Sequence, residues 1–388
     1  MFIKRIAEIK LKDYLTKNKI IIILGARQVG KTTLIEEVVK NLKVKLLNLD
    51  IEVDKSRLTA AFSLPPFEAK KSFDNPDIFV VDEAQRLPEI SRIVKGWYDA
   101  HLPLKVILLG SSSLNILDQS AENLTGRNIK LYLPPLLFKE IITHQSWYID
   151  AFPKKIINQN FSDQINSLIS QLITYGSYPE TIVTSEKEQY LLNLVSDYLL
   201  KDIYQLNLIK SSDIIKKLLL LLAYQIGSEV SVNELSKTLQ VSRVTINKYL
   251  DLLEKTFVIF RLPAFSTNQR KEITRNNKIY FWDTGVRNAL IKDFSFFPNR
   301  SDLGHLWENW VIAEVAKKNL LEGEKYNLYF WRNTDGSEVD LVIKGTNTFK
   351  AYEIKWSKTN KIINKSFTNK YKIKAATITK NNILDLVF

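Results

Sequence analysis

The stretch that decides the fold of the first part of this chain reads Gly25-Ala26-Arg27-Gln28-Val29-Gly30-Lys31-Thr32. It matches the pattern G-x-x-x-x-G-K-T, which acts as a phosphate-binding loop when it joins a buried strand to a helix. Residues 20–24 before it are apolar throughout and read as a buried strand, and residues 33–42 after it read as an amphipathic helix. This context favours a phosphate site over a glycine-rich turn that only joins two elements.

The residue types in this loop suit a nucleoside triphosphate held together with Mg²⁺. Its glycines let backbone N–H groups curl around a phosphate at a helix N-terminus, where the helix dipole also favours negative charge. Lys31 would reach the β- and γ-phosphates, and the Thr32 hydroxyl would hold Mg²⁺. The sequence thus predicts ATP and Mg²⁺ as cofactors, and the predicted nucleotide-binding residues of the loop are Gly25, Arg27, Gln28, Val29, Gly30, Lys31, Thr32 and Thr33.

Further apolar runs follow the loop and alternate with helical stretches, and they occupy residues 44–50, 77–83, 104–110 and 129–133. This alternation indicates a parallel sheet that is covered on both faces. Ligands of such sheets lie at the carboxyl ends of the strands. The loop and the polar residues that close the later strands are therefore expected to meet at one edge.

The pair Asp82-Glu83 closes one of these strands. Asp82 would complete the Mg²⁺ site, and Glu83 would orient or deprotonate the attacking water. Two acids at a solvated strand end are the alternative. Ser112 follows the next strand and is predicted to sense the γ-phosphate, although a hydroxyl at that place also serves as a helix cap.

Phosphoryl transfer needs a cation on the charge that develops in the transition state. After Arg127 the next arginine is Arg243, so the helical stretch that would form a lid, residues 161–209, contains none. Arg127 is therefore the predicted catalytic cation, acting in its own subunit or on a neighbour. Arg86 and Arg92 are the reserves, and an ordinary surface role for Arg127 is the alternative.

From residue 214 the pattern changes to short helices. Ser231 and Glu234 have the spacing of a capping box that opens one helix, and a turn at 241–242 leads into a second helix over 243–255. A strand at 257–262 completes a pattern typical of a winged helix-turn-helix. The inward positions of the second helix are predicted to be Val244, Leu250 and Leu253. The outward groups predicted to bind nucleic acid are Arg243, Thr245, Asn247 and Lys248. Winged helices also serve as protein-contact modules.

The last third carries a D…E-x-K arrangement. Strand periodicity over 338–343 and 349–356 places Asp340, Glu353 and Lys355 on one face of a hairpin. The two carboxylates would hold Mg²⁺, and Glu308 would complete the metal site from a helix at 306–315. Lys355 would act as a catalytic group that orients the attacking water. This arrangement is that of a metal-dependent nuclease, although charge-rich hairpins also produce it by accident.

Composition bounds the class of protein. The 388 residues contain 55 Lys and Arg against 42 Asp and Glu, a net charge of +13 that favours a nucleic-acid partner, with DNA as the first choice. A generally lysine-rich proteome is the alternative explanation of this charge. The absence of cysteine excludes disulfides and thiol catalysis. We find no signal-peptide pattern and no membrane-length apolar run, so a cytoplasmic protein without a membrane partner is expected.

Together these motifs resemble a large bacterial and archaeal family of AAA-type ATPases with a C-terminal domain of unknown function. The other segments that carry the resemblance are Phe79-Val80-Val81-Asp82-Glu83-Ala84-Gln85, Leu108-Leu109-Gly110-Ser111-Ser112-Ser113, Leu124-Thr125-Gly126-Arg127, Leu133-Pro134-Pro135-Leu136, Gly176-Ser177-Tyr178-Pro179-Glu180, Asp283-Thr284-Gly285 and Glu338-Val339-Asp340. Ser177 departs from the family pattern, which has glycine there. The resemblance covers essentially the whole chain.

The expected fold is α/β. It consists of a parallel-sheet P-loop (AAA+) domain over 1–140, a helical lid over 141–210, a winged helix-turn-helix over 211–270 and, as the resemblance implies, a restriction-endonuclease-like α/β domain over 271–388. The leading hypothesis is an ATP-hydrolysing protein that acts on nucleic acid, with ATP gating a metal-dependent nuclease-like domain. One alternative is an ATP-dependent switch whose last domain binds DNA or protein without cleavage. Another is an ATPase with a protein partner alone. A homo-oligomer is left open.

Overall fold

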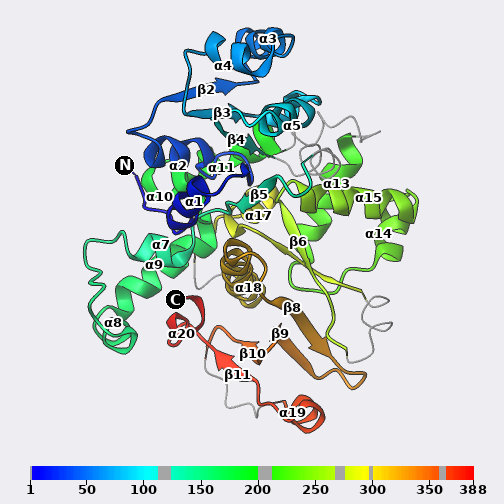
Figure 1. The fold of residues 1–388 in the computed structure, drawn as a ribbon. Coiled ribbons are helices and arrows are strands. Elements are labelled where there is room, and N and C mark those ends of the chain that lie inside the picture. Colours follow the sequence, from blue (N-terminus) through cyan, green and yellow to red (C-terminus); the bar gives the residue numbers. More distant parts are fainter. Residues whose placement is uncertain (1, 112–123, 200–211, 267–275, 297–299, 358–363) are drawn as a thin grey trace. The chain divides into compact units, whose positions relative to one another are not determined.

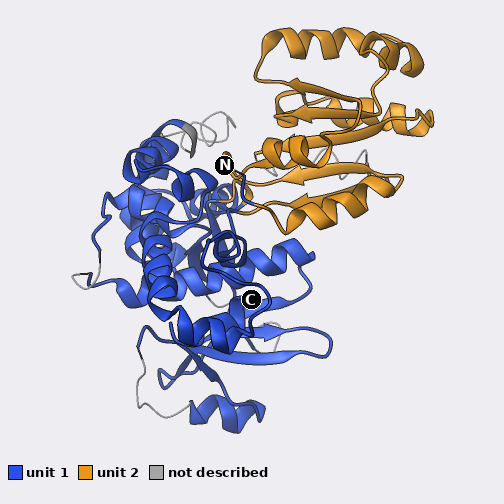
Figure 2. Ribbon diagram, turned by 90° about the vertical axis from the view of Figure 1, so that its left-hand side faces the viewer, with its two compact units in different colours: residues 1–3, 135–254, 258–388 blue, residues 4–134, 255–257 orange. Residues whose placement is uncertain are grey.

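The structure, a computed structural model, describes residues 2–111, 124–199, 212–266, 276–296, 300–357 and 364–388. The chain divides into two compact units (Figure 2). The N-terminal unit consists of residues 4–134 together with residues 255–257. The C-terminal unit consists of residues 1–3, 135–254 and 258–388. Each unit is described by itself.

The N-terminal unit contains the predicted parallel sheet, with five strands in the order β2-β3-β4-β1-β5 within the described residues (Figure 1). The strands are β1 (Ile20–Leu24), β2 (Val44–Asn48), β3 (Ile78–Asp82), β4 (Lys105–Gly110) and β5 (Asn128–Tyr132). Every residue of β1 and β3 is buried, as expected for strands that are covered on both faces. The parallel α/β fold of this unit is confirmed.

The helices of this unit are, in chain order, α1 (Ala7–Thr16), which precedes β1, and then α2 (Lys31–Val38), α3 (Glu52–Ala61), α4 (Pro66–Ser72), the 3₁₀ turn η1 (Ala84–Arg86) and α5 (Ile90–Asp99). Helix α1 packs on α2 and on β5. The short segment 255–257 belongs to this unit because the Phe257 ring packs on Tyr132 of β5, with ring centroids 6.3 Å apart.

The C-terminal unit combines many short helices with two small sheets. The helices are α7 (Phe138–Ile142), α8 (Lys154–Asn160), α9 (Ser162–Tyr175), α10 (Pro179–Val183), α11 (Lys187–Asn193), the π-helix η2 (Leu194–Leu199), α13 (Ser212–Tyr224), α14 (Val232–Leu239), α15 (Arg243–Lys255), α17 (Thr284–Ile291), α18 (Leu303–Glu322), α19 (Lys365–Tyr371) and α20 (Leu384–Val387). The strands are β6 (Ile259–Leu262), β7 (Lys278–Phe281), β8 (Asn327–Arg332), β9 (Glu338–Lys344), β10 (Phe349–Ile354) and β11 (Ala376–Ile378).

The two sheets of this unit are formed by strands from the last third of the chain, β6 to β11. Strands β8, β9 and β10 are antiparallel neighbours, and β11 adds to β10 in parallel, which gives the order β11-β10-β9-β8. Strand β6, which we predicted as the wing of the helix-turn-helix, pairs antiparallel with β7. A domain boundary at residue 270 therefore falls between two paired strands.

Helices α14 and α15 lie where the sequence pattern predicts them. The Ser231 hydroxyl accepts a hydrogen bond from the Glu234 amide, as expected for a helix N-cap. Leu250 and Leu253 are buried, but Val244 is 75% exposed, so its predicted inward position is wrong. The buried stripe of α15 runs through Ile246, and a residue two positions earlier lies about 200° around the helix from that stripe.

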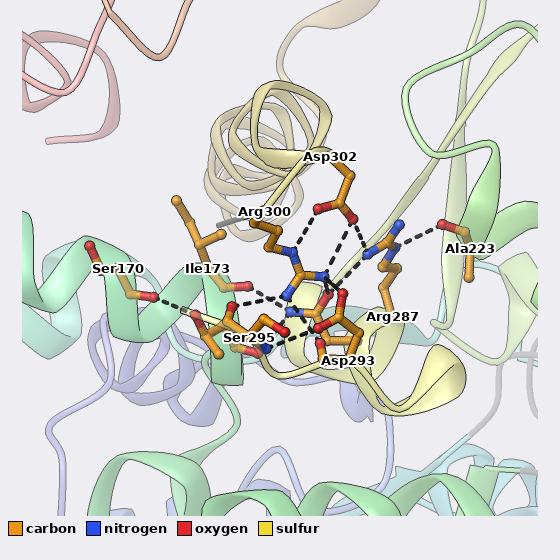
Figure 3. A network of polar contacts seen from close by, with 10 residues as sticks. Ser170, Ile173, Ala223, Arg287, Asp293, Ser295, Arg300 and Asp302 are labelled. Carbon is orange, nitrogen blue, oxygen red and sulfur yellow. Dashed lines mark hydrogen bonds and ion pairs between the residues drawn. The ribbon is translucent and has the colours of Figure 1, made fainter. Parts of the chain in front are cut away.

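Two buried polar networks hold the helices of this unit together. Figure 3 shows the first, in which Asp302 at the start of α18 accepts from Arg287 of α17 at 2.6 Å and from Arg300 at 2.7 Å. The same Arg287 donates to the Ala223 carbonyl of α13 at 2.8 Å (Figure 3). Bidentate and charge-assisted hydrogen bonds of this kind fix the relative positions of the elements that carry them.

The second network is centred on Lys317 of α18, whose side chain is 2% exposed. Its ammonium donates to Glu314 and to the Ser177 hydroxyl at 2.8 Å each, and to the Leu136 carbonyl at 3.3 Å. The other oxygen of Glu314 accepts from the Phe138 amide at 2.7 Å. We call these residues the Lys317 cluster. They fix the segment that precedes α7 onto α18.

No helix of the described residues is both long and apolar enough to cross a membrane.

Candidate active site

The phosphate-binding loop and the acidic pair meet at the carboxyl ends of β1 and β3, as predicted. The Thr32 hydroxyl donates to Asp82 at 2.7 Å. Lys31 is buried, and its ammonium donates to the carbonyls of Gly25 at 2.8 Å and Ala26 at 3.0 Å. A hydroxyl and a carboxylate side by side are oxygen ligands of the kind Mg²⁺ prefers, so Thr32 and Asp82 fit this cation.

Local backbone geometry explains the residue types of the loop. A Cβ at Gly25 would come within 2.1 Å of the Leu133 carbonyl oxygen, so no larger residue fits there. Gln28 and Gly30 have left-handed φ angles of 62° and 90°. The two residues that flank Val29 are thus both left-handed, and α2 begins directly after Gly30, with Lys31 as its first residue. Thr33 is exposed on that helix.

Glu83 is held beside the loop in a strained conformation, with a left-handed φ of 52°. Its carboxylate accepts from the Ser111 hydroxyl at 3.3 Å and from the Gln85 amide, and it lies 3.6 Å from the Arg27 guanidinium. Glu83 is thus oriented by a hydroxyl, an amide and a cation. These three contacts hold the Glu83 side chain in one orientation.

Two of the groups that orient Glu83 were missed from the sequence. Ser111 directly precedes the predicted γ-phosphate sensor Ser112, which lies outside the described residues. Gln85 stands two positions after Glu83 in the same motif, and this spacing was the available signal. A third missed residue is Asp50, which accepts from Arg86 at 2.7 Å and lies 3.4 Å from Arg27. Arg86, one of the reserve cations, is therefore held by Asp50, whereas Arg92 is exposed on α5.

Arg127 lies at the opposite end of the sheet from the loop. Its carbonyl accepts from the amide of Ile20, the first residue of β1, whereas the loop follows the last residue of that strand. The strand separates the two ends by about 15 Å. The Arg127 guanidinium is bound to Asp99, with contacts of 2.7 and 3.3 Å. The expectation that Arg127 acts on the nucleotide of its own subunit is therefore corrected.

The three residues of the D…E-x-K arrangement share one face, as predicted. Tyr352 of β10 pairs with Leu341 of β9, and continuing this register places Glu353 opposite Asp340. Asp340 accepts from the Ile354 amide at 2.6 Å and from Lys355 at 3.1 Å. Burial raises the pKa of Glu353, and its neighbour Lys355 opposes that rise.

Glu308 lies in a buried cluster with a residue that we did not predict, Lys278 of β7. The Lys278 ammonium bridges Glu308, at 2.9 Å, and Glu338. The Tyr280 hydroxyl also donates to Glu308, at 2.6 Å. Burial raises the pKa of Glu308 to about 7 although Lys278 lowers it. Burial opposes the charge of Lys278, yet the two carboxylates raise its pKa above the ordinary value.

The two lysines bear on whether this cluster fits a metal ion. In the described part of the chain no three Asp, Glu or His side chains converge as metal ligands do. Lys278 and Lys355 already supply the positive charges that Glu308, Glu338 and Asp340 face. A divalent cation at Glu308 would have to displace the buried ammonium of Lys278, whereas Lys355 beside Asp340 is partly exposed. A metal site formed by Glu308, Asp340 and Glu353 stays a prediction.

Sequence profiles of known protein families match three parts of the chain. Residues 17–142 match the sequence profile described as AAA domain. Two further matches are to domains of unknown function, DUF8612 over residues 166–296 and DUF4143 over residues 303–384.

Relatives extend over most of the chain. An uncharacterized protein of Mycobacterium tuberculosis is 26% identical over 365 residues, which are 92% of this chain and 75% of the relative. An uncharacterized protein of Methanocaldococcus jannaschii is 26% identical over 355 residues, or 89% of this chain and 76% of the relative. Among solved structures, the Walker-type ATPase PABY2304 of Pyrococcus abyssi is similar in fold, with a TM-score of 0.52 and 15% identity over 75% of this chain and 96% of its own.

The chain therefore contains an AAA-type P-loop ATPase domain, followed by a C-terminal domain of unknown function. The candidate nucleotide site of this domain is the loop at Gly25–Thr32, with Asp82 and Glu83 beside it.

Proposed function

We propose that this chain is an ATP-dependent molecular switch that binds nucleic acid, and that its C-terminal domain acts without metal-dependent cleavage. ATP and Mg²⁺ bind at the loop, with Lys31 on the phosphates and with Thr32 and Asp82 on the cation. Glu83 activates the attacking water. The net charge of +13 supports a polyanionic partner.

One observation supports the proposed coupling between ATP binding and partner binding. Helix α15 presents Arg243, Asn247 and Lys248 to solvent. The Thr245 hydroxyl is instead paired with the Ser242 hydroxyl at 2.9 Å, which caps the helix. Lys255, the last residue of α15, belongs with residues 256 and 257 to the N-terminal unit. The helix proposed to bind nucleic acid therefore ends within the unit that binds ATP.

Salt dependence tests the nucleic-acid contact. Each phosphate that a lysine neutralises contributes about −0.9 to the slope of log affinity against log salt concentration. We expect Lys248→Ala to flatten that slope by about this amount. Lys217→Ala is the matched control, because Lys217 is an exposed lysine of α13 that is already paired with Asp213. The measurement is fluorescence anisotropy with labelled duplex DNA, single-stranded DNA and RNA. No binding to any probe at low salt would shift the proposal to a protein partner.

A metal-dependent nuclease is the second candidate, since Asp340, Glu353 and Lys355 share one face. The test is incubation of the protein with supercoiled plasmid and Mg²⁺ or Mn²⁺, with and without ATP. The switch proposal expects no cleavage. Cleavage that disappears in Asp340→Asn and persists in the control Asp335→Asn, an exposed turn residue of the same domain, would establish the nuclease instead.

A role for Arg127 on the nucleotide of a neighbouring subunit remains a further proposal. It requires ATPase turnover per chain to rise with protein concentration.

A further inference from the structure

Arg5 precedes helix α1, 20 residues before the phosphate-binding loop, and no sequence motif includes it. Only 4% of its surface is exposed. One guanidinium nitrogen donates to the Val29 carbonyl at 2.7 Å, and the other donates to the Pro134 carbonyl at 2.7 Å. A buried guanidinium with two short contacts of this kind is held in one position.

The contact with Val29 determines how the loop presents its N–H groups. In a trans peptide unit the carbonyl and the following N–H point in opposite directions. The Val29 carbonyl points toward Arg5, so the Gly30 N–H must point away from Arg5. Backbone N–H groups on the inner side of such a loop are the ligands of a phosphate.

The contact with Pro134 gives Arg5 a fixed support. Pro134 follows Leu133, whose amide donates to the Leu24 carbonyl at 2.7 Å and whose carbonyl closes off the space beside Gly25. The two ends of the guanidinium therefore join the middle of the loop to the chain segment that packs on its first residue. A lysine has a single nitrogen and no planar fork, so it cannot hold both carbonyls in this way.

We propose that Arg5 is a positioning residue for nucleotide binding, which orients the Val29–Gly30 peptide unit toward the phosphates. The inference rests on ATP binding at the loop and is independent of the partner bound by α15.

The test measures the Kd of Mg–ATP by isothermal titration calorimetry and the Tm by circular dichroism. Arg5→Ala removes the charged donor that fixes the orientation of the Val29–Gly30 peptide unit. We therefore expect Arg5→Ala to raise the Kd about tenfold or more. Arg5→Lys keeps the charge and is expected to show most of this loss. The control Arg57→Ala, an exposed arginine of α3 in the same unit, should keep the wild-type Kd.

A second control separates positioning from simple stability. Leu11 is fully buried on α1, and Leu11→Ala should lower the Tm while keeping the wild-type Kd at temperatures where the protein is folded. A Kd raised equally by Leu11→Ala and Arg5→Ala would overturn the proposal. So would a wild-type Kd in Arg5→Lys, which also decides the matter if Arg5→Ala fails to fold. A wild type that does not bind Mg–ATP would overturn the ATPase assignment together with this inference.

Discussion

Replacing Glu83 by Gln is expected to lower the kcat of ATP hydrolysis about 100-fold or more and to leave the Kd of Mg–ATP unchanged. The carboxylate is held by Ser111, Gln85 and Arg27 beside the loop, where it can take a proton from the attacking water. The amide of glutamine keeps the size and can still orient a water molecule, but it cannot accept that proton. The residues proposed to bind the nucleotide, Lys31 and Thr32, are not changed by this substitution.

Steady-state phosphate release and calorimetric binding of Mg–ATP check this expectation together. Glu89→Gln makes the same chemical change at an exposed position six residues later and should retain wild-type turnover. A Glu83→Gln protein that hydrolyses ATP at the wild-type rate would remove Glu83 from the mechanism. Loss of binding together with turnover would instead assign Glu83 a role in holding the nucleotide.

Replacing Lys317 by Met is expected to destabilise the C-terminal unit by about 3–5 kcal/mol. Methionine matches the length of the lysine chain but supplies no charge and no donor. Glu314, whose side chain is 1% exposed, would then be a buried carboxylate without its cation. The Ser177 hydroxyl and the Leu136 carbonyl would lose a hydrogen-bond donor at the same time.

Urea unfolding followed by circular dichroism measures the loss. Adding Glu314→Gln to Lys317→Met removes the uncompensated charge and keeps an oxygen for the Phe138 amide, so the double variant should be more stable than Lys317→Met alone. The control Lys318→Met changes the next lysine of α18, which is only partly buried, and should cost much less. Equal losses in Lys317→Met and Lys318→Met would contradict a stabilising role for the Lys317 cluster.

The nucleotide site could be predicted because its signals are local. The apolar strands, the loop and the Asp82-Glu83 pair each occupy a short stretch of sequence. Parallel topology then brings the carboxyl ends of neighbouring strands together without further information. The contact between Thr32 and Asp82, which are 50 residues apart, follows from these facts alone.

Residues whose side chains contact groups far away in the sequence could not be predicted in this way. Arg5 bonds to the carbonyls of Val29 and Pro134, and a carbonyl acceptor has no residue-type signature. Lys278 reads as an ordinary strand residue until the fold places Glu308 and Glu338 beside it. The position of Arg127 could have been predicted, because it directly precedes the strand expected at 129–133. In a parallel sheet the residue before a strand lies at the end opposite the ligands.

Ser177 shows how a departure from a family pattern is accommodated. Its hydroxyl accepts from Lys317 and donates to Asp283, at 2.8 and 3.2 Å, so the extra oxygen is fully paired within a buried network. Its amide donates to the same Asp283 carboxylate at 2.7 Å, a contact that glycine would also make. The neighbouring residue must be glycine, because a Cβ at Gly176 would lie 1.9 Å from an Asp283 oxygen.

The passage of helix α15 into the Phe257 segment has a thermodynamic consequence. If ATP changes the affinity of the α15 surface for its partner by some factor, the partner must change the affinity for ATP by the same factor, because the two binding free energies share one coupling term. Coupling of this kind commonly amounts to about 1–3 kcal/mol. Phe257, packed on Tyr132 of β5, follows α15 directly in the chain, and we propose this segment as the place where such coupling would pass. In that case the partner would alter the affinity for ATP as strongly as ATP alters the affinity for the partner.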